Sequence, residues 1–168
     1  MPTKNAMLGV VIVMMMVAPV RAAEEPKPPP TDAAGCTASR FFDAFHNESR
    51  CVLETPKVPF NDGRQDTTVF LRVDGKSLYV MTDSNVDIAK PDVGIRVDER
   101  KLIKPDSVFL DQHLLYESQI AQILEQFKAG MVVEVQLHFW PTWPSKGMKK
   151  VSFSLIGFTR NFARLPGC

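Results

Sequence analysis

Two stretches near the end of the sequence alternate apolar and polar residues with a period of two. In residues 131–140 one face is apolar, and the other carries Glu134 and His138. Residues 149–158 repeat this pattern, with Phe153 on the apolar face. Such alternation is typical of antiparallel strands with one face packed and the other in water. The two stretches are therefore predicted to pair in an antiparallel sheet.

Four earlier segments are also typical of short strands. Two of them flank Asp74 and Gly75, a residue pair that favours a tight hairpin turn. Another contains Pro105, which limits it to a short strand or the edge of a sheet. These predicted strands span residues 68–73, 77–81, 93–97 and 101–109.

One amphipathic helix is predicted before the last two strands. In residues 116–129 apolar side chains recur at helical spacing, and Gly130 follows where a C-terminal cap belongs. Thr159 is placed to cap a last helical turn. Residues 38–45 have phenylalanines at helix-compatible spacing, but the segment is short and its conformation stays open. The predicted fold class is mainly β, an antiparallel β-sandwich with one helix.

The first 22 residues differ in composition from the rest of the chain. They contain five of the eight methionines, two basic residues and no acidic residue. Their apolar run, Leu8 to Val17, is about half the length that a membrane span needs, and Ala22 ends a small-residue cleavage site. We therefore expect export and no transmembrane segment in the mature chain. The predicted division is a signal peptide at 1–22, a Pro-rich tether at 23–35 and a single domain at 36–168.

The sequence contains three cysteines, Cys36, Cys51 and Cys168. Export would bring them into an oxidising compartment, where disulfides are expected. The proximity of Cys36 and Cys51 in the sequence favours their pairing. Cys168 could instead be the partner, remain a free thiol or link to another chain. No metal site is expected, because there is no CxxC motif and the three histidines are scattered.

No motif indicates catalysis or a cofactor. The sequence has no Gly-x-Ser-x-Gly nucleophile turn and no glycine-rich phosphate loop. Asp83-x-Asn85-x-Asp87 resembles the start of a calcium loop, but Ile88 stands where that loop needs glycine, so an acidic turn is favoured. Lys and Arg number 20 against 19 Asp and Glu, so nucleic acid is not an expected partner. We expect a protein that is not an enzyme.

Both tryptophans, Trp140 and Trp143, lie in one turn that also contains Pro141 and Pro144. Exposed aromatic side chains on a stiff loop suit recognition, because they offer contact area at low entropic cost. Alternatively, the two rings fold back and cover the end of the sandwich. Trp143 lies between the prolines and is the better candidate anchor. Both tryptophans are candidate partner-binding residues.

Several of these features together resemble the bacterial invasion-associated locus B family. Cys36 and Cys51 bracket the first mature segment, and residues 93–98 read Val-Gly-Ile-Arg-Val-Asp. In the C-terminal block, residues 123–130 lead into a strand, and residues 153–159 read Phe-Ser-Leu-Ile-Gly-Phe-Thr. The central cysteine pair of many members is absent. The resemblance implies a periplasmic or outer-membrane-associated protein with a role in host-cell invasion and no assigned catalysis.

The sequence thus predicts an exported, non-enzymatic envelope protein that acts on a partner protein in the envelope or on a host cell. The alternative is a periplasmic module that binds a small ligand in the sandwich interior or at the turn containing Trp140 and Trp143. A flat exposed aromatic patch would favour the first function, and a deep pocket with convergent polar groups the second. The identity of the partner and the oligomeric state stay open.

Overall fold

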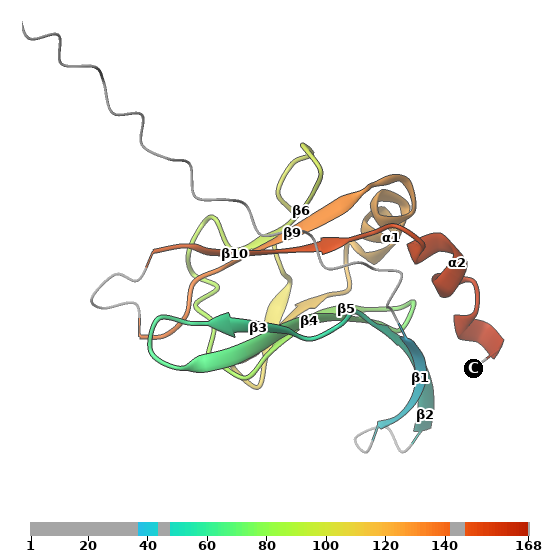
Figure 1. The fold of residues 1–168 in the computed structure, drawn as a ribbon, viewed down its shortest axis with the longest axis horizontal. Helices are drawn as coiled ribbons and strands as arrows, with labels where there is room; N and C mark the ends of the chain where they lie inside the picture. Colours follow the sequence, from blue (N-terminus) through green and yellow to red (C-terminus); the bar gives the residue numbers. More distant parts are fainter. Residues whose placement is uncertain (1–36, 44–47, 142–146, 168) are drawn as a thin grey trace, which may run out of the picture.

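The computed structural model describes residues 37–43, 48–141 and 147–167. The chain forms two antiparallel sheets that lie one above the other (Figure 1). In the larger sheet the strand order is β1-β2-β4-β5-β8-β7, with β3 also paired to β4. Its strands are β1 (Thr37–Asp43), β2 (Glu48–Glu54), β3 (Val58–Asn61), β4 (Asp66–Val73), β5 (Leu78–Thr82), β7 (Ser107–Phe109) and β8 (His113–Tyr116). The smaller sheet, in the order β10-β9-β6, consists of β6 (Gly94–Val97), β9 (Val132–Leu137) and β10 (Lys149–Ser154).

The hydrophobic core contains residues from both sheets. Val80 and Leu114 of the larger sheet and Val135 and Phe153 of the smaller sheet are all fully buried within one cluster. Burial of apolar side chains is the main favourable term in folding, so this shared core holds the two layers together. The structure confirms the predicted mainly β fold with antiparallel sheets.

The predicted pairing of the last two strands is confirmed. Val135 of β9 lies opposite Val151 of β10, and Val133 lies opposite Phe153. On the other face, Glu134 forms an ion pair of 3.0 Å with Lys150 of the neighbouring strand. The alternation in the sequence therefore predicts the apolar face correctly. The prediction that the other face lies in water is corrected, because Gln136, Ser152 and Ser154 are buried.

The hairpin between β4 and β5 also follows the prediction. Val73 pairs with Leu78, and Gly75 has a φ of +88°, a conformation that glycine adopts without steric cost. The carboxylate of Asp74 accepts hydrogen bonds from the backbone N–H groups of Lys76 and Ser77, at 2.8 and 2.7 Å. These two bonds fix the turn.

The chain has two α-helices and one 3₁₀ helix among its described residues: α1 (Ile120–Ala129), α2 (Phe158–Phe162) and η2 (Leu165–Gly167). The predicted helix is α1, and it precedes β9 and β10. It begins later than predicted, because Tyr116 ends β8 and pairs with Leu78. No described helix is long and apolar enough to cross a membrane.

Gly130 ends α1 as predicted, but for a different reason. Its φ is −93°, so the backbone is extended rather than left-handed. A Cβ atom at this position would lie 2.4 Å from a methyl group of Val97 and 2.8 Å from the carbonyl oxygen of Gln126. Close packing against β6 and α1 therefore requires glycine here.

The conformation of the segment 38–45, which the sequence leaves open, is a strand as far as residue 43, because residues 37–43 form β1 and pair with β2 along its whole length. Two local predictions are corrected. β10 ends at Ser154, so Phe158 belongs to α2 rather than to the strand. Thr159 lies inside α2, and the residue at the N-cap is Gly157, with a φ of +84°.

Candidate functional site

The end of β9 places one of the two predicted recognition residues at the surface. Phe139 is buried, whereas the side chain of Trp140 is 52% exposed. Phe139 pairs with Val86 in an isolated antiparallel bridge, and the N–H of Trp140 donates to the carbonyl of Asn85 at 2.9 Å. Trp143 lies outside the described residues. The structure therefore shows an exposed position for Trp140 and leaves that of Trp143 a prediction.

The turn between β7 and β8 adds two more exposed apolar side chains. Phe109 is 40% and Leu110 is 65% exposed. The turn is attached to the segment 83–88, because the N–H of Val86 donates to the carbonyl of Asp111 at 2.8 Å. Segment 83–88 thus joins the β7–β8 turn to the end of β9.

Ile88 completes this group. It is 38% exposed and follows Asp87, whose N–H donates to the carbonyl of His138 at 2.8 Å. Of the seven exposed large apolar side chains in the described part of the chain, four lie on these connected segments. We call this group the apolar end; it consists of Ile88, Phe109, Leu110 and Trp140.

The backbone of the β7–β8 turn is strained. Leu110 and Asp111 have φ values of +52° and +59°, in the left-handed region. Bulky side chains rarely adopt this conformation, and it costs about 1–2 kcal/mol per residue. Residues held in such conformations are often functional. Here the strained turn carries the most exposed leucine of the described chain into solvent.

A polar pair lies beside the apolar end. Nε2 of His138 lies 3.0 Å from the carboxylate of Asp92. This hydrogen bond is the main reason that the pKa of Asp92 lies below its ordinary value.

Within residues 37–43, 48–141 and 147–167, no group of three or more His, Cys, Asp or Glu side chains is placed to hold a metal ion.

A second site lies at the opposite end of the molecule. The chain leaves β9 at the left of Figure 1, whereas β2 and α2 lie at the right. An open pocket of about 370 Å³ lies between β2, the β4–β5 turn and the two C-terminal helical segments. Its lining is Glu48, Ser49, Arg50, Cys51, Asp74, Gly75, Lys76, Phe162, Leu165 and Pro166.

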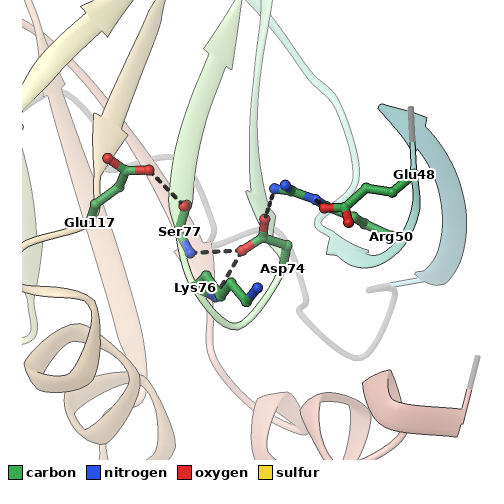
Figure 2. A network of polar contacts seen from close by, with 6 residues as sticks. All are labelled: Glu48, Arg50, Asp74, Lys76, Ser77 and Glu117. Carbon is green, nitrogen blue, oxygen red and sulfur yellow. Dashed lines mark hydrogen bonds and ion pairs between the residues drawn. The ribbon is translucent and has the colours of Figure 1, made fainter. Parts of the chain in front are cut away.

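The charged groups at this pocket largely neutralise one another (Figure 2). Arg50 lies 2.5 Å from the carboxylate of Glu48 and 3.5 Å from that of Asp74. Behind the turn, Ser77 donates to Glu117 at 3.2 Å. Because Asp74 also accepts two backbone N–H groups, its carboxylate is engaged in holding the turn and is poorly placed to act as a base.

The sequence predicts only some of the residues at these two sites. Cys51 lies in β2, half-buried at the pocket. Cys36 lies outside the described residues, so the Cys36–Cys51 disulfide stays a prediction. Phe109 and Leu110 were missed, although an apolar pair directly before an acidic residue is unusual where a polar turn is expected.

Comparisons of the chain with protein-family models, curated proteins and solved structures find no match. The resemblance to the invasion-associated locus B family therefore depends on the sequence motifs alone and stays a prediction.

Proposed function

We propose that this protein is an exported, non-enzymatic bacterial envelope protein that binds a partner protein, in the envelope or on a host cell, through its apolar end. The observation that carries this proposal is that four of the seven exposed large apolar side chains of the described chain lie on segments joined by backbone hydrogen bonds. These four are Ile88, Phe109, Leu110 and Trp140. Gathered exposed apolar side chains commonly mark interaction surfaces. Tryptophan is also among the residues that contribute most to binding when an interface covers them.

The apolar end is held in place before any partner arrives. Val86 connects to both neighbouring segments, through its N–H to Asp111 and through its bridge to Phe139. A surface that is already ordered loses less conformational entropy on binding.

Export and the envelope location are supported by the sequence. Residues 1–22 have the composition of a secretory signal peptide, and the motifs at 93–98 and 153–159 resemble those of a periplasmic or outer-membrane family. The partner is accordingly proposed to be a protein that an exported molecule meets, either in the envelope or on a host cell.

A pull-down from native envelope and from host-cell membranes tests the proposal. The test variant is Leu110→Asn, because asparagine tolerates a left-handed backbone and removes the apolar side chain. The matched control is Met131→Gln, which changes a similarly exposed apolar residue outside the apolar end. We expect a partner that wild type and Met131→Gln retain and that Leu110→Asn loses by tenfold or more. Equal retention by all three proteins would refute the proposal.

The pocket supports a second candidate function, the binding of a small ligand. Its volume of about 370 Å³ lies in the lower part of the range for ligand sites. Phe162 and Leu165 supply an apolar wall, and Lys76 is exposed at the rim. A ligand bound here would depend on Lys76 and not on Leu110, so Lys76→Ala separates the two functions.

A further inference from the structure

Cys51 lies on a strand whose register is defined residue by residue. It pairs with Arg40 of β1, and its half-buried side chain lines the pocket formed with Leu165 and Pro166. Cys51 has an interaction partner in the structure. The register and the position of the C-terminal helical turn together decide which cysteine can reach it.

The register argues against Cys36 as the partner. Thr37 lies opposite Glu54, three positions along the strand from the Arg40–Cys51 pair. At about 3.3 Å per residue, Thr37 is displaced about 10 Å along the strand from the position opposite Cys51. With about 4.8 Å between paired strands, the Cα of Thr37 is about 11 Å from that of Cys51. Since the Cα of Cys36 lies about 3.8 Å from that of Thr37, it stays beyond the limit of about 7 Å between the Cα atoms of a disulfide. Pairing with Cys36 would therefore disrupt the β1–β2 pairing, which argues against the Cys36–Cys51 bond that proximity in the sequence favours.

The C-terminal helical turn approaches Cys51 from the other side. Leu165 and Pro166 of η2 line the same pocket as Cys51, and η2 lies close to β2. Cys168 follows Gly167, the last residue of η2. One further residue spans about 3.8 Å, so the fold allows Cys168 to reach β2 without moving any described element.

We infer that Cys51 forms a disulfide with Cys168, and that this bond fastens the apolar wall of the pocket to β2. Each thiol loses its proton, and the two sulfur atoms give two electrons to the disulfide of a small or protein oxidant. As the Cys51–Cys168 bond forms, the oxidant's own S–S bond is reduced to two thiols. The disulfide adds a covalent link to the packing that already holds Leu165 in the hydrophobic core and Phe162 against it.

Peptide mapping without reduction tests the inference directly. The full chain is equilibrated with glutathione disulfide, remaining thiols are alkylated, and the protein is digested with trypsin. Cleavage after Arg40, Arg50, Lys57 and Arg164 places the three cysteines in separate peptides. We expect peptide 51–57 linked to peptide 165–168 in a protein that migrates as a monomer. A link from 51–57 to the peptide ending at Arg40, a glutathione adduct on Cys51, or an alkylated Cys51 would overturn it.

Two single variants provide a matched comparison. Cys168→Ser should lower the melting temperature by about 5–10 °C, because the bond closes a loop of more than a hundred residues. It should also speed hydrogen exchange in residues 158–167. Cys36→Ser should change neither quantity. The opposite ranking of the two variants would overturn the inference, even if both proteins fold.

Discussion

The backbone N–H of Trp140 donates a hydrogen bond of 2.9 Å to the carbonyl oxygen of Asn85. This bond continues the bridge between Val86 and Phe139 and attaches the end of β9 to a segment more than fifty residues earlier in the chain. Because Val86 also bonds the turn at Asp111, three distant segments meet here. These few backbone contacts connect the segments that carry the exposed side chains of the apolar end.

The strain at Leu110 predicts an unusual order of stabilities. Leu110→Asn should leave the free energy of unfolding unchanged or raise it by up to about 1 kcal/mol, because asparagine tolerates a positive φ. Leu110→Val should lower it by about 1 kcal/mol, because a β-branched side chain tolerates that backbone least. Urea unfolding measures both values. Equal losses in the two variants would mean that the turn is not strained.

Phe153 tests the packing between the sheets. It is fully buried and lies opposite Val133. Phe153→Ala should lower the free energy of unfolding by about 3–5 kcal/mol, the range for a large buried aromatic side chain. Lys149→Ala, at the start of the same strand, should lower it by less than about 0.5 kcal/mol. Similar losses in the two variants would contradict the register of β10.

The sequence predicts the local features of the fold, namely the faces of single strands and one tight turn. Alternation in 131–140 and 149–158 determines which face of each strand is buried, and Asp74-Gly75 has the chemistry of a tight turn. The strand β1 was ambiguous, because adjacent phenylalanines fit a helix or a strand, and its pairing with β2 decides between them. The sequence singles out Trp140, but the location of Ile88, Phe109 and Leu110 on segments joined to it could not be predicted, since it depends on single bridges between distant segments. Such contacts leave no periodic pattern in the sequence.

Gly94 is predicted to be intolerant of a side chain. A Cβ atom there would lie 2.3 Å from the carbonyl oxygen of Ile103. That oxygen accepts a hydrogen bond from the N–H of Ile95, and the N–H of Ile103 donates one to the carbonyl of Ile95. Gly94→Ala should therefore lower the free energy of unfolding by about 2–3 kcal/mol. Gly147→Ala is the matched control, because its φ is +71° and no atom lies within 4 Å of the added methyl group. It should cost only about 1 kcal/mol, the backbone contribution alone.

His113 should make the stability depend on pH. Burial, followed by the positive charge of Arg72, lowers the pKa of His113 below its ordinary value, although Asp83 opposes the shift. The unfolded chain therefore binds a proton more readily than the folded protein does. Stability from this group is complete above the ordinary pKa of about 6.5 and falls as the pH drops from there toward the folded-state pKa. His113→Gln should reduce the loss of unfolding free energy between pH 7 and 5, and an unchanged loss would contradict the assignment.

Site-specific photocrosslinking tests the central claim, that a partner protein binds the apolar end. A photoreactive amino acid is placed at position 110 or, as a control, at position 156, where Ile156 is similarly exposed outside the apolar end. Each protein is incubated with native envelope and, separately, with host-cell membranes before irradiation. We expect a discrete crosslinked product from position 110, in at least one of the two preparations, and none from position 156. Products of equal yield from both positions, or none from position 110 in either preparation, would contradict it.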